Sequence, residues 1–522
     1  MTRPPTPDAA HTVGCAPAAH SAPHRRWSGP AAWLAAGTGG DLPAGIGYTA
    51  AAVAAFGLAL SFAFVCAEYP IDWAEGRVFD TARLILEGSP LYCDIDRLPC
   101  ADLTYPPLYS ALVAGLEMVF GVGFRTGRAV SFAALVWILV SLYRIARAQF
   151  DERSALAAPA VFLFFIEVCF FAGVLRPDVL SLALVLAAID VLIRRPTVGG
   201  AVCSAFLMLL GLFTKPHSLA AVFAACVFLA LRDRKRLVAF VTVGMAGGAL
   251  IFGLGQLLTG GRFVDHHLRY VMSQSNTFIQ LRKVLFYGAL PWAIFIAVAL
   301  YHSLRALRQP LGLLPIYFLT SVAWALATGG KDGAAPNYLF ELYVATSLAV
   351  AGFLHARRGR PSEAAGRLDR LAAVLLSIQV ILCLGLNPWI GLERYFSNRK
   401  LWSGRETMVP ALRAAPEPIL VEELGVAGYT GHRLFVNSYI VTRLSNLHQW
   451  DEGPLLALLR SRRFSRVVLR EAPADHPSEL QRERFTPGML QAIAANYRVS
   501  WSDGNWFVYE PREGDAPDST TR

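Results

Sequence analysis

Apolar runs separated by short polar segments dominate the chain. The first clear run is "YTAAAVAAFGLALSFAFVCA". A helix of about twenty apolar residues crosses the hydrocarbon core of a bilayer. The pattern predicts about eleven membrane-spanning helices, at residues 46–67, 126–146, 154–174, 178–193, 199–214, 217–231, 237–258, 285–303, 311–328, 338–354 and 369–389.

The stretch at 106–124 is apolar as well, but we predict that it is not a span. It opens with Pro106 and Pro107 and carries Glu117 in its middle. If it crossed the membrane, it would move five basic loops downstream to the outer side, against the positive-inside rule. We therefore expect a helix at the outer membrane surface or a partly re-entrant segment.

The loops after residue 125 alternate strictly between base-rich and base-poor. The base-rich loops are "RIARAQFDER", "RRPTVGG", "RDRKR", "HSLRALRQP" and "HARRGRPSEAAGRLDR". The rule places them in the cytoplasm, with a cytoplasmic N-terminus and an extracytoplasmic C-terminus. The net charge of +10 thus reflects membrane topology. The basic residues stand in short clusters between apolar runs, which argues against a nucleic-acid partner.

Composition agrees with a polytopic α-helical membrane protein. Charged residues make up 16% of the chain, against about a quarter in soluble proteins. Residues 1–44 predict a disordered cytoplasmic tail, 45–390 a transmembrane domain, and 391–522 a soluble extracytoplasmic α/β domain. The last segment has short β-like runs, "PILVEE", "RLFVN", "RVVLRE" and "NWFVYEP", and the helical stretch "TPGMLQAIAANY".

The first outer loop, 68–124, is acidic in its first half, although the chain is basic. Its segment "EGRVFDTARLILEG" has Phe79, Ala82 and Leu86 on one helical face, and Gly88 where a helix would stop. Two carboxylates, Asp72 and Glu75, stand at the start of this helix. Cys93 and Cys100 lie in the same loop, and the sequence leaves two alternatives for them, a disulfide or two free thiols.

The order of several motifs resembles the GT-C glycosyltransferases, on the bacterial branch related to protein O-mannosyltransferases and to the lipid A aminoarabinose transferase. The resemblance covers about 46–355 and rests on "DWAEGRVFDTARLILEGSPLY", "LTYPPLYSALVAGLEMVFG", "LRPD", "TKPH" and "GGKDGAAPNYLFEL". The C-terminal domain matches no motif of that family.

The resemblance implies an inverting glycosyltransferase that moves a sugar from a polyprenyl-phosphate donor to a glycan, lipid or protein acceptor at the outer face. A first-loop carboxylate would act as general base, and the matching positions are Asp72 and Glu75. Many relatives have adjacent acids before the glycine; here Asp72 is displaced, so either residue is a candidate base. The structural alternative for Asp72 is a helix N-cap.

Further polar residues at the expected outer ends of spans are candidates for the donor site and the cavity wall. A cation suits the donor phosphate, although Lys215 could also simply extend to the interface. Tyr105 stands where some relatives have Lys, and Pro106 could equally mark a plain helix entry. The donor-binding candidates are Lys215, His217, Arg269 and Tyr105, and the cavity-lining candidates are Arg176, Asp178, Asp265, His266, Lys331, Asn337 and Glu341.

No cofactor is required by these motifs, and a divalent metal ion is left open. His266 and His267 are adjacent, and neighbours on a helix point apart, which disfavours a shared metal. The rival function is a transporter or flippase for a lipid-linked or polar solute, which would place its polar groups near the bilayer midplane. The expected location is a bacterial-type plasma membrane.

Overall fold

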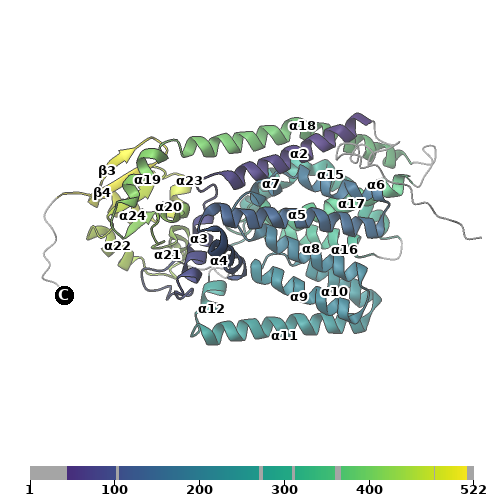
Figure 1. Ribbon diagram of the computed structural model, residues 1–522, viewed down its shortest axis with the longest axis horizontal. Helices are drawn as coiled ribbons and strands as arrows, with labels where there is room; N and C mark the ends of the chain where they lie inside the picture. Colours follow the sequence, from purple (N-terminus) through teal and green to yellow (C-terminus); the bar gives the residue numbers. More distant parts are fainter. Residues whose placement is uncertain are drawn as a thin grey trace, which may run out of the picture.

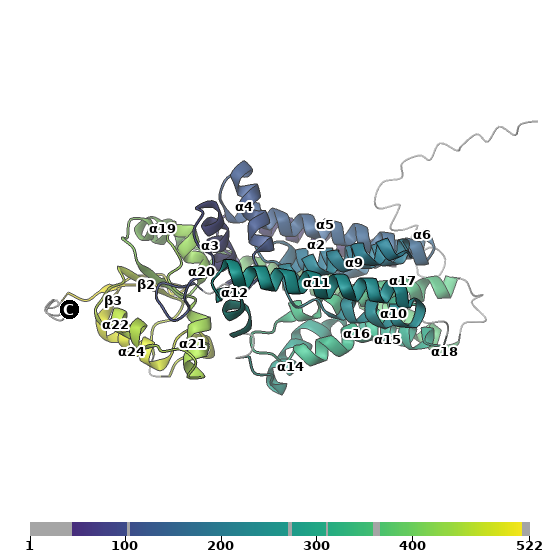
Figure 2. The ribbon, with the colours of Figure 1, turned by 90° about the horizontal axis from the view of Figure 1, so that it is seen from below.

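A computed structural model describes residues 44–101, 105–269, 274–308, 312–358, 366–474 and 476–513. The molecule is elongated, with a domain of long helices and a smaller mixed domain, formed by the C-terminal part of the chain, at one end (Figures 1 and 2). The predicted N-terminal tail lies outside the described residues except for Ala44.

Six spans in the described part are long and apolar enough to cross a membrane, or seven if one bent pair is counted. They are Gly47–Cys66 within α2 (Ala44–Cys66), α5 (Phe124–Gln149), α11 (Arg234–Leu258), Phe278–Ala306 (α14, Phe278–Val284; η2, Leu285–Ala289; η3, Leu290–Trp292; α15, Ala293–Ala306), Pro336–Arg358 (η4, Pro336–Leu339; α17, Phe340–Arg358) and α18 (Arg367–Leu401).

The bent pair is α6 (Glu152–Phe164) and α7 (Ile166–Ala172), which meet at 75°. Phe165 separates them with a non-helical ψ of 88°. The break frees backbone groups from the helical ladder, and such groups need a partner inside a membrane protein. Asn387 of α18 supplies one, because its Nδ2 donates to the Phe164 carbonyl at 2.9 Å.

Four further helices are shorter than a full span. They are α8 (Asp178–Arg194), α9 (Val198–Thr214), α10 (Ala220–Arg232) and α16 (Leu313–Thr328). Each of the eleven segments expected from hydropathy falls on one of these helices, on the bent pair or on one of the six spans. The mostly helical architecture is confirmed, whereas the number of eleven crossings stays a prediction.

The first loop forms two helices against the end of the bundle. Helix α3 (Glu75–Leu86) ends where expected, since Gly88 follows its C-cap with a φ of +65°. Helix α4 (Leu108–Phe120) covers the stretch predicted to lie at the membrane surface. Its 13 residues rise only about 20 Å, less than the bilayer core. Its end is apolar and open, with Met118 79% and Phe120 74% exposed.

The C-terminal domain is a four-stranded sheet with small helices. Strand β1 (Ile419–Val421) pairs in parallel with β2 (Arg466–Leu469), and β4 (Phe507–Pro511) is antiparallel to both β2 and β3 (Tyr497–Ser502), in the order β1-β2-β4-β3. The helices are α19 (Arg405–Arg413), α20 (Leu424–Thr430), α21 (Ser438–Asn446), α22 (Gly453–Arg460), α23 (Glu479–Arg484) and α24 (Pro487–Asn496).

Three of the four β-like runs are strands, and the expected strand at 433–437 is wrong. Arg433 is held by α3, with Nε 3.1 Å from Asp80 and Nη1 2.5 Å from Glu87. Asn437 then caps α21 by accepting from the Ile440 amide. The segment is therefore drawn along the first loop, where Val436 forms an isolated bridge with Cys100.

The first loop lies between the helical domain and the C-terminal domain (Figure 2). Ile95 and Cys100 of the loop belong to the hydrophobic core of the C-terminal domain. Trp450 donates from Nε1 to the Ile95 carbonyl at 2.9 Å. The acidic segment is therefore held from two sides. The small domain packs onto it and supplies Arg433 for Asp80 and Glu87, whereas basic residues of the helical domain pair with Glu68, Asp72 and Glu75.

Candidate functional site

Polar side chains from several chain segments meet where the helical domain faces the C-terminal domain. Arg176 and Lys215 each precede a proline, and the residue before proline is biased away from the helical conformation. As a result α8 begins directly after Pro177, and α9 ends at Lys215, which has an extended φ of −153°. Both side chains are thereby placed at helix ends, next to the segment before α3.

Asp72 is the most accessible acid of this group. Its side chain is 18% exposed, and Arg176 Nη1 donates to both of its carboxylate oxygens, at 3.0 and 3.3 Å. Oδ1 also accepts from the Ala74 amide at 2.9 Å. The formal N-cap of α3 is Ala74, so Asp72 orders the turn before the helix and keeps a partly open carboxylate.

Glu75 is fully buried and fully engaged. Its side chain and that of Arg128 are both 0% exposed, and Arg128 donates to Oε1 at 2.7 Å and to Oε2 at 2.8 Å. The amides of Ile71, Asp72 and Leu175 also donate to the carboxylate, at 2.6, 3.3 and 2.7 Å. Such saturation stabilises a buried charge and fixes the first loop to α5 and to the segment before α8.

Asp178 forms the buried centre of the group. Lys215 Nζ and Asn337 Nδ2 both lie 2.5 Å from its Oδ1, and Arg176 Nε lies 3.2 Å from Oδ2. Asp178 is 3% and Lys215 9% exposed. Arg176 therefore bridges an accessible carboxylate and a buried one. A carboxylate in the first turn of α8 also interacts favourably with the helix dipole.

Tyr105 is surrounded by three cations. Arg176 Nη2 donates to its hydroxyl at 3.3 Å, the Arg77 guanidinium lies 4.4 Å from its ring centroid, and Lys215 Nζ lies 5.5 Å from it. Burial raises the pKa of Tyr105, but Lys215, Arg176 and Arg77 outweigh burial, so the pKa is lowered from its usual value. The site favours negative charge at this position.

Arg77 is a buried cation. Its side chain projects from α3, the residue is 6% exposed, and its Nε has no hydrogen-bond partner. Within the described part of the chain no ion pair or hydrogen bond of its guanidinium is present. An unsatisfied buried charge is costly, so this group is suited to an anionic ligand.

Three more of the candidates from the sequence are His217, Lys331 and Glu341. The His217 ring lies 3.3 Å from the Tyr338 carbonyl oxygen, and its centroid lies 4.1 Å from that of the Tyr338 ring. Lys331 follows α16 and forms an isolated bridge with Asn276. Glu341 accepts from the Ala220 and Ala221 amides at 3.1 and 2.8 Å, which caps α10.

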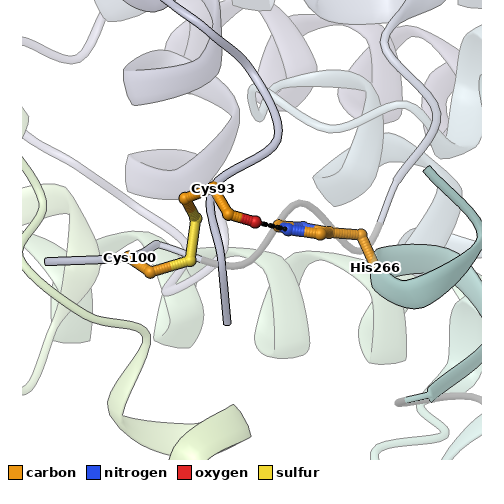
Figure 3. Close-up of side chains that lie close together, drawn as sticks. All are labelled: Cys93, Cys100 and His266. Atoms are coloured by element: carbon orange, nitrogen blue, oxygen red, sulfur yellow. Dashed lines mark hydrogen bonds between the residues drawn. A yellow bond between two sulfur atoms is a disulfide. The ribbon is translucent and has the colours of Figure 1, made fainter. Parts of the chain in front are cut away.

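The histidine segment contacts the first loop around Tyr92 and Cys93. It follows α12 (Arg262–Val264) in the π-helix η1 (Asp265–Arg269). Asp265 is exposed, and His266 Nε2 lies 2.9 Å from the Cys93 carbonyl oxygen (Figure 3). The side chain of Arg269 lies outside the described residues.

Cys93 and Cys100 form a disulfide with a Cα–Cα distance of 5.7 Å, which resolves the open alternative. The two sulfurs and a His266 ring nitrogen lie within 4.8 Å of one another. A metal would need thiolate ligands, and both sulfurs are bonded to each other (Figure 3). The disulfide form therefore does not fit a metal at these residues.

Several residues that the structure places in this region were not singled out from the sequence. Arg128 lies in the predicted span at 126–146, and a charge at such a position is a signal of a buried partner. Arg77 looked like one charge in a mixed helix. Trp73 donates from Nε1 to the Glu422 carbonyl at 3.2 Å, and the Arg484 guanidinium lies 4.0 Å from its ring centroid. These last contacts had no local signal.

Comparison with known proteins agrees with the motifs. The family described as dolichyl-phosphate-mannose-protein mannosyltransferase matches residues 104–254. No curated protein matches the chain by sequence. The structure of ArnT from Cupriavidus metallidurans in the apo state superimposes with a TM-score of 0.60 at 15% identity, over 88% of this chain and 97% of that one.

Two further solved structures have the same fold. ArnT from Cupriavidus metallidurans bound to undecaprenyl phosphate gives a TM-score of 0.59 at 15% identity, over 88% of this chain and 97% of that chain. The oligosaccharyltransferase of Archaeoglobus fulgidus in the apo form gives 0.50 at 13% identity, over 90% of this chain and 75% of that chain. At these identities the likeness is one of fold. The expected resemblance to GT-C glycosyltransferases is confirmed, and the apolar helices indicate an integral membrane protein.

Proposed function

We propose that this chain is an inverting glycosyltransferase that moves a sugar from a polyprenyl phosphate to an acceptor at the outer face of the membrane. The matching family and the ArnT-like fold support glycosyl transfer. The complex of ArnT with undecaprenyl phosphate supports a lipid-phosphate donor of this type. The sugar is a hexose or a pentose, and the acceptor is a glycan, lipid or protein.

The observation that carries this proposal is the excess of buried cations around Tyr105. Arg77, Arg176 and Lys215 surround it, whereas the carboxylates that face them are Asp72 and Asp178. A donor phosphate would supply the missing negative charge. Lys215 keeps two further ammonium protons beside its bond to Asp178, since an ammonium has three donors.

Asp72 is our candidate for the general base. It is the acid of the group with access to solvent, and a base must reach the acceptor proton. The acceptor hydroxyl or amine would lose its proton to Asp72 while its oxygen or nitrogen attacks the anomeric carbon. The bond from that carbon to the phosphate oxygen breaks, and the polyprenyl phosphate leaves as an anion held by the cations.

Glu75, the second candidate from the sequence, fits a positioning role. Its five hydrogen bonds leave no exposed oxygen. By fixing the amides of Ile71 and Asp72, it holds the backbone from which the Asp72 carboxylate projects. Asp178, Asn337 and Arg176 would hold Lys215 and Asp72 at a fixed separation. A metal ion is not needed for these steps.

Donor binding tests the proposal directly. Undecaprenyl phosphate should bind the purified protein saturably, and Arg77→Gln should weaken binding by about tenfold or more, as expected for a lost charge-assisted hydrogen bond. The matched control is Arg125→Gln at the same end of the domain, where the side chain is 58% exposed. Equal affinity of both variants would contradict the phosphate site.

Reporter fusions test the orientation. A reporter fused after residue 236 or 360 should be cytoplasmic, and one fused after residue 400 should be outside. These outcomes follow from the basic loops and from α4 as a surface helix. If fusions at 236 and 400 report the same side, our interpretation of residues 106–124 is wrong.

A transporter or flippase for a lipid-linked or polar solute is the second candidate, since it too needs many helices and buried charges. A transporter is expected to place polar groups in broken helices at the midplane, and the break at Phe165 is compatible with that. Proteoliposomes separate the two functions. A flippase moves a labelled polyprenyl-phosphate sugar between leaflets, whereas the enzyme forms a new glycosidic product from it.

A further inference from the structure

A cavity lies at the end of the helical domain away from the C-terminal domain. It has a volume of about 300 Å³ and is formed by parts of α5, α15, α16, α17 and the start of α18. Figures 1 and 2 show these helix ends gathered on the side opposite to the sheet. The cavity is thus separated from the Asp72 site by the length of the helices.

Arg305, Arg357 and His302 line the cavity, and each has nitrogen atoms that make no hydrogen bond within the described structure. Arg305 uses only Nη1 on the Asp369 carboxylate, at 2.8 and 3.0 Å. Arg357 uses only Nη1, on the Asp369 carbonyl at 2.9 Å. Among the described residues, the remaining nitrogens of the two guanidinium groups make no hydrogen bond or ion pair, and neither does the His302 ring. Its Nε2 lies 2.6 Å from where a Cβ on Gly352 would stand, so the ring packs on α17.

The acid of the cavity is already neutralised. Asp369 accepts from Tyr301 and Arg305, and Asp151, which contacts the lining residue His355, lies 2.8 Å from His355 and 3.1 Å from Arg358. The cavity lining therefore has more cationic donors than acids. This excess favours an anionic ligand with several oxygen acceptors, such as a phosphate group.

Part of the cavity lining is apolar. It includes Leu313, Leu314 and Pro315 at the start of α16, with Leu348 and Phe353 of α17. A wall of this kind beside basic groups suits a molecule with a charged head and an apolar body. Basic pockets between transmembrane helices on the cytoplasmic side recognise anionic lipid headgroups.

We propose that this cavity is a binding site for a phosphate group, provided either by an anionic lipid headgroup or by a free phosphate. Arg305 and Arg357 hold the phosphate oxygens with their unused nitrogens, and His302 adds a ring N–H. The apolar wall contacts the acyl chains when the source is a lipid. This site is independent of the proposed sugar transfer, because none of its residues belongs to the Asp72 group.

Binding to the full chain in phosphatidylcholine nanodiscs tests the proposal. The probes are short-chain phosphatidylglycerol and, separately, inorganic phosphate, and the readout is the saturable rise of the unfolding temperature. Arg357→Gln should weaken binding about tenfold, since it removes one charged donor that makes no ion pair in the described structure. Ala356→Trp should abolish binding, because Ala356 is exposed at the lining and the indole fills the space.

The matched control is Arg153→Gln, an exposed cation at the same end that does not line the cavity; it should bind as the parent does. Saturation by phosphatidylglycerol alone identifies a lipid headgroup, and saturation by inorganic phosphate with the same sensitivity to both variants identifies a free anion. Absence of binding by both probes overturns the proposal. So does equal binding by the parent, Arg357→Gln and Ala356→Trp.

Discussion

The two ends of the helical domain both carry clusters of ion pairs, and the clusters differ in burial. At the end facing the C-terminal domain, Asp178 is 3% and Lys215 9% exposed. At the opposite end, Asp151 is 37% and His355 45% exposed. The first cluster is covered by the first loop and the small domain, whereas the second faces outward from the basic loops.

This difference separates charges that serve topology from charges that serve a site. Exposed pairs contribute about 0–1 kcal/mol, and basic loops at that end follow from the insertion rule. Buried charges are expensive to desolvate, and the fold loses much of its stability when one partner of a buried pair is removed. The covered cluster therefore marks a place where charge is held at a cost in stability, which is typical of a functional site.

Substitution of Asp72 should have the largest effect on the rate of sugar transfer. Asp72→Asn keeps the size of the side chain and an acceptor for the Ala74 amide, but removes the proposed base. Sugar transfer should fall by about 10²–10⁴-fold, measured with purified protein and a panel of polyprenyl-phosphate sugars. Binding of undecaprenyl phosphate should be retained.

The control is Glu68→Gln in the same loop, where the acid is 67% exposed and pairs with Arg125. It should transfer sugar at the parent rate. Parent-level transfer by a folded Asp72→Asn variant would show that this loop does not supply the base.

Glu75 should act on stability as well as on rate. Glu75→Gln leaves Arg128 charged and buried, and loss of one partner of such a pair costs about 3–5 kcal/mol. The thermal unfolding temperature in detergent should drop clearly. The double variant Glu75→Leu with Arg128→Met should recover part of the loss, because no uncompensated charge remains. A double variant less stable than Glu75→Gln would argue against the pair as the cause.

Lys215→Ala should have an intermediate effect on the donor. One charge-assisted contact to the phosphate is removed, worth about 1.5–3 kcal/mol, so the affinity for undecaprenyl phosphate should fall. Lys215→Arg should recover part of it, since charge is kept and shape is changed. Unchanged donor affinity in the alanine variant would refute the phosphate role.

Substitutions at the end of the helical domain away from the C-terminal domain should have the smallest effect on stability. Asp151 caps α6 by accepting from the Ser154 amide at 3.0 Å. Asp151→Asn keeps a cap and loses only exposed ion pairs, so the stability should change by about 1 kcal/mol or less. Asp151→Ala also loses the cap and should cost about 0.5–2 kcal/mol. A loss after Asp151→Asn as large as after Glu75→Gln would remove the contrast between the two ends.

Much of the fold could be predicted because its signals are local. Hydropathy marks each long helix, and the face of Phe79 and Ala82 with Gly88 as a stop located α3. Proline after Arg176 and after Lys215 set the helix ends that carry both cations. The expected strand at 433–437 did not form because Arg433 binds Asp80 and Glu87, more than 340 residues earlier in the chain.

The site was only partly predictable for the same reason. Asp72 and Glu75 are equivalent in sequence, since both are acids near the start of one helix. Their difference comes from Arg128, 53 residues away, and from the Leu175 amide, 100 residues away. Glu341, a candidate for the cavity wall, caps α10 through amides about 120 residues earlier, and no local pattern signals that contact.

The sequence by itself determined the membrane class, the helical segments, the α/β character of the C-terminal domain and the acids and bases from which a site could be built. Those features depend on hydropathy, on helical periodicity and on proline and glycine, which act within a few residues. Only the tertiary structure decided that Arg77 lies beside Tyr105 with no acceptor among the described residues, that Glu75 is buried while Asp72 stays accessible, and that Arg305 and Arg357 line one cavity. The energy of a charge depends on its burial and its partners, and both are set by segments that meet only when the chain is folded.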